Sequence, residues 1–142
     1  MKKVVMILSL LFAVTIVQAQ TESVKLATGK IDGNEWYIQK ETTPSRTTTY
    51  FWWGFQNEKY SHIVDIGSIY ISTKKSMSTM IEQLKTVASK ADGTTFSYGV
   101  FRLYDFSNDI YVYDDSKFTT ISKTDALEFA KLLETKINLL VQ

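Results

Sequence analysis

The chain has 142 residues, of which 44% are hydrophobic, 22% charged and 13% aromatic. This composition excludes a disordered tail, because it supplies enough apolar side chains to build a core. The formal net charge is +1, so we expect no basic stripe for nucleic acid or for an anionic membrane. One folded domain without a nucleic-acid partner is therefore expected.

Residues 1–19 have the pattern of a cleaved secretory signal peptide. Lys2 and Lys3 precede a mostly apolar run over residues 4–17, and Val17 and Ala19 place small residues where a signal peptidase reads them. The run is shorter than the roughly 20 residues that a membrane-spanning helix needs. Cleavage after Ala19 would leave residues 20–142 as a single globular domain.

The absence of cysteine narrows the expected location and architecture. Lipid attachment to an exported protein requires a cysteine at the new N-terminus, and disulfides require two. We therefore expect a soluble protein in the periplasm or outside the cell, with no lipid anchor and no stable membrane anchor after cleavage.

The mature chain begins with four predicted strands. Alternating side chains over residues 24–30 and 35–40 flank the turn sequence Asp32-Gly33-Asn34, which predicts a hairpin. Residues 48–55 and 62–72 form a second predicted hairpin around residues 56–59. The polar segment 42–49, which contains Pro44, suits a surface loop.

The hydrophobic period then changes to that of a helix over residues 76–91, with Ser76 as the expected N-cap. Strands are predicted again over residues 95–104, 110–113 and 117–121, and a last helix runs from Ser122 to about Leu140. The order ββββ-α-βββ-α predicts an α+β fold. We expect one antiparallel sheet of about six to seven strands with two amphipathic helices set against it.

An aromatic run in the third predicted strand needs the most explanation. Tyr50 and Trp52 point to one face, and Phe51, Trp53 and Phe55 point to the other. A run that is apolar on both faces is typical of a strand covered on both sides, and the pattern favours this interpretation. The functional alternative is an aromatic platform on one face that binds a sugar, a peptide or another protein.

A second aromatic group lies in the later strands. Tyr98 and Tyr104 are expected on one face of a single strand, and Tyr111 and Tyr113 on one face of the next. Such a surface suits a binding partner, because tyrosine offers a large and rigid contact area. Ordinary cross-strand aromatic pairing would give the same pattern.

Few residues indicate catalysis. His62 is the only histidine, which excludes most zinc sites and most nucleophilic triads. The acidic residues of two predicted loops suit either turns or calcium binding, although their spacing does not fit an EF-hand. These loop residues are Asp105, Asp109, Asp114 and Asp115. No catalytic residue, metal site or cofactor is predicted.

These observations predict an exported, non-catalytic binding domain that uses an aromatic sheet surface. The candidate partner is a protein or a carbohydrate, and assembly into a homo-oligomer is a further interpretation. The alternative function is a small hydrolase acting outside the cytoplasm, with His62 beside Asp65 or Asp105. The candidate binding residues are Tyr50, Trp52, Trp53, Tyr98, Tyr104, Tyr111 and Tyr113.

Overall fold

A computed structural model describes residues 21–60, 62, 64–90, 95–98 and 101–140, so the predicted signal peptide lies outside the described residues. The first half contains strands β1 (Glu22–Ile31), β2 (Asn34–Thr42), β3 (Thr47–Gln56) and β4 (Ile66–Ile71), then helix α2 (Lys74–Ser89). The second half contains strands β5 (Thr95–Tyr98), β6 (Phe101–Phe106), β7 (Asp109–Asp114) and β8 (Lys117–Ser122). Helix α3 (Lys123–Lys136) and the short 3-10 helix η1 (Ile137–Leu139) follow.

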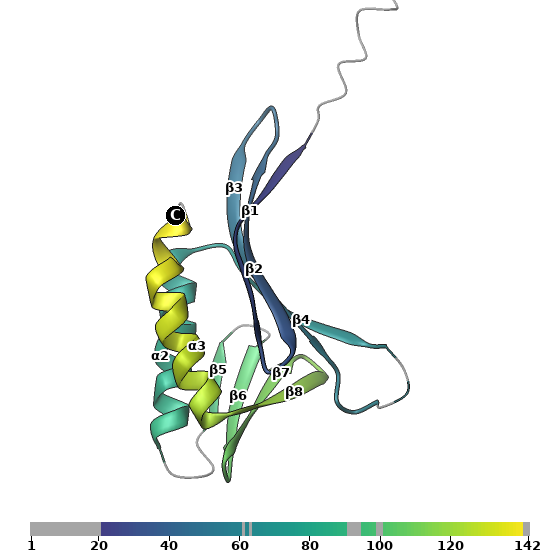
Figure 1. The fold of residues 1–142 in the computed structure, drawn as a ribbon, viewed down its shortest axis with the longest axis vertical. Helices are drawn as coiled ribbons and strands as arrows, with labels where there is room; N and C mark the ends of the chain where they lie inside the picture. The colour runs from purple at the N-terminus through teal and green to yellow at the C-terminus, as the bar shows by residue number, and fades with distance from the viewer. Residues whose placement is uncertain (1–20, 61, 63, 91–94, 99–100, 141–142) are drawn as a thin grey trace, which may run out of the picture.

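The strands form two antiparallel four-stranded sheets, in the orders β1-β2-β3-β4 and β5-β6-β7-β8. The predicted α+β class is confirmed, but the prediction of one sheet with six to seven strands was wrong. Residues 95–104 do not form one strand, because Thr95 pairs with Tyr104 and Phe96 with Leu103 across the β5–β6 hairpin. The chain therefore runs through four strands and a helix twice (Figure 1).

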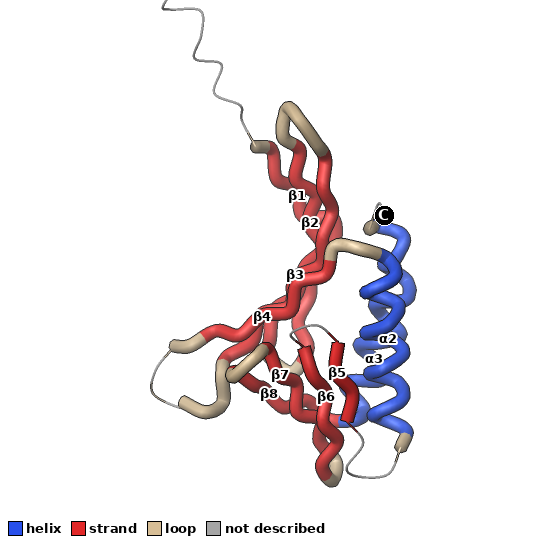
Figure 2. Tube along the Cα trace, turned by 180° about the vertical axis from the view of Figure 1, so that it is seen from behind, coloured by secondary structure: helices blue, strands red, loops and turns tan. Residues whose placement is uncertain are grey.

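Both helices lie side by side on one side of the two sheets (Figure 1 and Figure 2). Each helix also contacts the other half of the chain. Helix α2, which follows the first sheet, packs on β5 and β6, whereas α3 carries Phe129 against Trp36, Phe51 and Trp53 of the first sheet. The buried residues of both sheets and both helices thus belong to one core.

Local sequence chemistry sets the turns and helix starts. Asp32 and Gly33 have φ values of 45° and 78° in the predicted turn, as in the type I′ turns that favour glycine. Helix α3 begins after Ser122, whose Oγ accepts a hydrogen bond from a first-turn N–H, as predicted. Helix α2 begins earlier than predicted, because Thr73 is the N-cap: its Oγ1 accepts from the Ser76 N–H at 3.1 Å.

Side chains satisfy backbone groups where β4 of the first sheet approaches β7 and β8 of the second. Asp114 Oδ2 accepts a hydrogen bond from the Ser68 N–H at 2.8 Å. Glu58 N–H donates to the Phe118 carbonyl at 2.9 Å, and Phe118 N–H donates to Asn57 Oδ1 at 3.3 Å. Unpaired strand edges accept further strands. The Ser68 N–H of β4 and the Phe118 N–H and carbonyl of β8 are thus hydrogen-bonded to the other half of the chain, and these groups are not free to pair with a further strand.

The fourth strand begins later than predicted, at Ile66, and Asn57 and Asp65 are hydrogen-bonded to each other at the two ends of the loop that precedes it. Asn57 Nδ2 donates to Asp65 Oδ2 at 2.9 Å, and Lys117 Nζ lies 2.7 Å from Asp65 Oδ1. The hydrogen bond from Asn57, followed by that from Lys117, holds the pKa of the Asp65 carboxyl below its ordinary value of 3.8. The Asp65 carboxylate thus joins this loop to the start of β8.

We expect Asp65→Asn to lower the free energy of unfolding slightly at neutral pH and to have no effect in strong acid. Because the pKa is lower in the folded state, the contribution is present above pH 3.8 and is lost as pH falls through the folded-state pKa. Urea denaturation over a pH series measures this. Asp109→Asn changes an exposed carboxylate and serves as the control. A deficit in Asp65→Asn that persists in strong acid would contradict the expectation.

Candidate functional site

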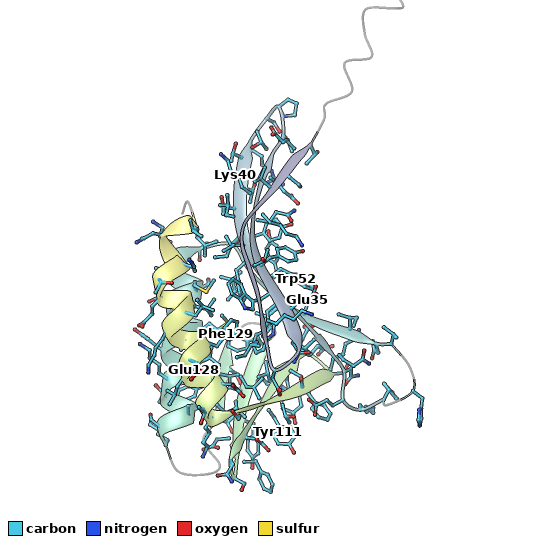
Figure 3. All side chains as sticks on the ribbon, viewed as in Figure 1. Glu35, Lys40, Trp52, Tyr111, Glu128 and Phe129 are labelled. Carbon is cyan, nitrogen blue, oxygen red and sulfur yellow. The ribbon has the colours of Figure 1, made fainter. Side chains whose placement is uncertain are left out.

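The face of the first sheet that points away from the helices carries four aromatic side chains. Tyr37 on β2 pairs in register with Trp52 on β3, and Trp52 pairs with Tyr70 on β4. Tyr50 lies two residues before Trp52 on the same face. Figure 3 shows Trp52 on this side of the sheet and Phe129 of α3 on the other. We call Tyr37, Tyr50, Trp52 and Tyr70 the first aromatic surface.

The rings of the first aromatic surface pack on one another. Trp52 stacks on Tyr37 with ring centroids 5.0 Å apart, and the centroids of Tyr50 and Tyr70 are 4.9 Å apart. Trp52 lies close to the sheet because Gly54 has no side chain, and a Cβ at that position would collide with the indole ring. Tyr70 is 56% exposed, and the other three side chains are partly exposed. This surface therefore faces solvent.

Polar and charged groups border the first aromatic surface. Tyr50 Oη donates to Glu41 Oε1 at 2.9 Å, and Gln39 Nε2 donates to the same oxygen at 3.0 Å. Lys25 Nζ lies 4.5 Å from the centroid of the Tyr37 ring. Burial raises the pKa of Tyr50 well above 10.0, and the hydrogen bond to Glu41 raises it further. The phenol therefore keeps its proton and acts as a donor at neutral pH.

Trp53 lies in the core and not on this surface. Its side chain has no exposed area, and its ring packs edge-on against Phe129 with centroids 5.0 Å apart. Successive strand residues point to opposite faces, so Trp52 and Trp53 have opposite environments. The interpretation that the pattern favoured, a strand covered on both sides, was wrong. Helices α2 and α3 cover one face of the sheet, and the other carries the exposed Tyr70.

The outer face of the second sheet carries a second group of aromatic residues. Tyr104 pairs in register with Tyr111, and their ring centroids are 6.5 Å apart. Tyr111 also lies 6.4 Å from Tyr113 and 5.7 Å from Phe118, and Figure 3 shows it on the side of the sheet away from α3. The Arg102 guanidinium lies 5.3 Å from the centroid of Tyr113. We call Tyr104, Tyr111, Tyr113 and Phe118 the second aromatic surface.

Five of the seven candidate binding residues lie on these two surfaces, and Trp53 lies in the core. The side chain of the seventh, Tyr98, lies outside the described residues. Tyr37 and Tyr70 were not among the predicted residues, because strand alternation assigns residues to faces but does not say which strands pair. Arg102 was not among them either, although a spacing of two residues from Tyr104 already places both on one strand face.

The three residues of the alternative hydrolase site, His62, Asp65 and Asp105, have different environments. His62 is exposed in the loop between β3 and β4. Asp65 is paired with Lys117, whereas Asp105 has no exposed area and its Oδ1 lies 2.9 Å from Lys123 Nζ. Both carboxylates are thus engaged by lysines, and the geometry favours structural roles for them.

Within the described ranges, no three histidine, aspartate or glutamate side chains come together as metal ligands. No helix in this part of the chain is long and apolar enough to cross a membrane. No protein-family model matches the chain, and no curated protein has a matching sequence.

Proposed function

We propose that this chain is an exported, non-catalytic binding domain that contacts its partner through the first aromatic surface. The observation that carries the proposal is the gathering of Tyr37, Tyr50, Trp52 and Tyr70 on the sheet face away from both helices. Exposed apolar patches on soluble proteins often mark interaction sites. Aromatic side chains are enriched there, because they supply a large contact area with little entropy to lose.

The ring geometry favours a protein partner over a carbohydrate. A sugar binds an aromatic side chain by stacking on a free ring face. Tyr37 is stacked on Trp52 and also lies under the Lys25 ammonium, and Tyr50 is packed against Tyr70. These rings present edges and phenol groups more than free faces. Protein side chains pack against ring edges, and the group around Glu41 supplies the polar rim of a protein interface.

Export is the second part of the proposal, and it depends on the signal-like pattern of residues 1–19. A mature chain without cysteine offers no thiol for lipid attachment or for a disulfide. The domain would then act as a soluble protein in the periplasm or outside the cell. Its stability would come from the shared core of the two sheets and two helices.

Site-specific photo-cross-linking in the native host tests the proposed function. A photoreactive phenylalanine analogue replaces Tyr70 in the full chain. The matched control places it at Leu132 on α3, because both side chains are exposed, at 56% and 39%. We expect protein adducts from position 70 to be several times more abundant than those from position 132. Adding Trp52→Ala to the position 70 variant is expected to remove most of these adducts, because it deletes the centre of the surface.

Three results would count against the proposed function. Equal adducts from the two positions would show that the first aromatic surface has no preferred contact. Adducts that survive Trp52→Ala would show that the surface does not hold the partner. Adducts with the mass of two copies of the chain would identify a homo-oligomer and contradict a different protein as the partner.

A further inference from the structure

A surface hollow of about 360 Å³ lies over the second sheet, apart from the first aromatic surface. Its described lining comes from three neighbouring strands: Thr95 from β5, Arg102 and Tyr104 from β6, and Tyr113 from β7. The register explains this grouping, since Thr95 pairs with Tyr104 and Arg102 pairs with Tyr113. The hollow thus combines two phenol rings, one hydroxyl and one guanidinium.

Arg102 is held in a defined position beside this hollow. Its Nη2 donates to the Asp115 carbonyl at 3.0 Å, and its guanidinium carbon lies 5.3 Å from the centroid of Tyr113. A guanidinium carries five N–H donors in a rigid plane. One hydrogen bond to a carbonyl therefore leaves other donors for a ligand, in the geometry that suits a carboxylate.

The charged group in the described lining of the hollow is a cation, which favours an anionic ligand. Arg102 is the charged residue among the four described residues that line the hollow. Asp114 follows Tyr113 in the chain, but its carboxylate accepts a hydrogen bond from the Ser68 N–H on β4. Tyr104, which is 37% exposed, supplies an apolar wall for a flat or ring-shaped body, whereas the Tyr113 ring packs beside Phe118 and holds the Arg102 guanidinium. The Thr95 hydroxyl supplies a further polar contact.

We infer that this hollow binds a small ligand with one carboxylate on a six-membered ring. The carboxylate pairs with the free donors of Arg102, and the ring packs against Tyr104. A uronate sugar and an aromatic acid share this chemistry, because both carry a carboxylate on a ring with an apolar face. The inference goes beyond the proposed function and uses different residues, so either can fail without the other.

Amide and side-chain NMR titration of the full domain with two acids tests the inference. Galacturonate and 4-hydroxybenzoate are the probes, and galactose and 4-hydroxybenzyl alcohol are their neutral counterparts. We expect at least one acid to bind and to shift signals of Thr95, Arg102, Tyr104 and Tyr113. Each neutral counterpart is expected to bind at least about tenfold more weakly than its acid, because it lacks the charge-assisted hydrogen bonds. Binding by only one acid would identify which ring the site accepts.

Arg102→Gln is expected to weaken binding of the acid at least about tenfold and to leave the neutral counterpart unchanged. Arg46→Gln is the matched control, because Arg46 is exposed in the loop between β2 and β3. Thermal unfolding verifies that each variant is folded. If Arg102→Gln does not fold, Tyr104→Ala replaces it, since that side chain is 37% exposed and its loss should weaken binding severalfold.

Three outcomes would overturn the inference. Neither acid binds at millimolar concentration, or the acids bind but shift signals outside strands β5, β6 and β7. In the third case, Arg102→Gln and Arg46→Gln bind the acid equally well, which would show that the Arg102 guanidinium does not contact the ligand. A positive result together with a negative cross-linking experiment would leave the hollow as the binding site and reject the first aromatic surface.

Discussion

Replacing Trp53 by alanine is expected to lower the free energy of unfolding by about 3–5 kcal/mol, as truncation of a fully buried aromatic side chain does. Trp53 has no exposed area. Its ring packs against Phe129 of α3 at 5.0 Å and against Phe55 at 6.0 Å between centroids. The substitution therefore opens a cavity where the first sheet meets the helices. Urea denaturation followed by circular dichroism measures the loss.

Trp52→Ala is the matched control, because it removes the same side chain from the neighbouring position on the opposite face. We expect a loss of about 1 kcal/mol, chiefly from the stacking of Trp52 on Tyr37. The two variants thus separate the core face from the solvent face of β3. Equal losses would show that both faces are covered, and the first aromatic surface would then have no free area for a partner.

The local elements were largely predictable, because each depends on residues close together in the sequence. The Asp32-Gly33 turn, the Ser122 cap and the helical period of α2 all follow from local backbone chemistry. The third strand also followed from its residues. The strand begins at Thr47, inside the segment 42–49 that was predicted as a loop from its composition. The turn between β2 and β3 needs only the residues around Pro44.

The division into two sheets was not predictable, because it depends on contacts between residues far apart in the sequence. Glu58 contacts Phe118, and Asp114 contacts Ser68. Alternation along a strand shows that one face is buried, but it does not show which strand lies alongside. The β5–β6 hairpin was missed although the sequence carries a local signal for it. The apolar side chains change phase from Phe96 and Tyr98 to Phe101 and Leu103, with Gly99 between them.

The candidate site was predictable by residue type and not by face. The aromatic run of β3 has the same pattern whether a strand is covered on one side or on both. The packing of α2 and α3 on one side decides between these cases, and it leaves Tyr50 and Trp52 on the surface and Trp53 in the core. Register then adds Tyr37 and Tyr70, which lie far apart in the sequence, to the same surface.

Asp105 shows how a structural carboxylate can resemble a loop residue in the sequence. The segment from Asp105 to Asp109 has the composition of a turn. In the structure β6 extends to Phe106, and Asp105 points inward with no exposed area. Its Oδ1 lies 2.9 Å from Nζ of Lys123, the first residue of α3. A buried carboxylate is stable only when it is paired, so this contact fixes the start of α3 against β6.

Lys123→Met is therefore expected to lower the free energy of unfolding by about 3 kcal/mol, because it leaves the Asp105 carboxylate buried without its cation. This is the low end of the range for a buried pair, since the Lys123 side chain is 23% exposed. A cation at a helix N-terminus is otherwise unfavourable, and a double variant tests whether the loss comes from Asp105. Lys131→Met, on an exposed part of the same helix, should change stability by less than about 0.5 kcal/mol. The double variant Asp105→Asn with Lys123→Met should recover most of the loss, because no charge is then buried. If Lys123→Met and its control Lys131→Met were equally stable in urea denaturation, the ion pair between Asp105 and Lys123 would contribute nothing to stability.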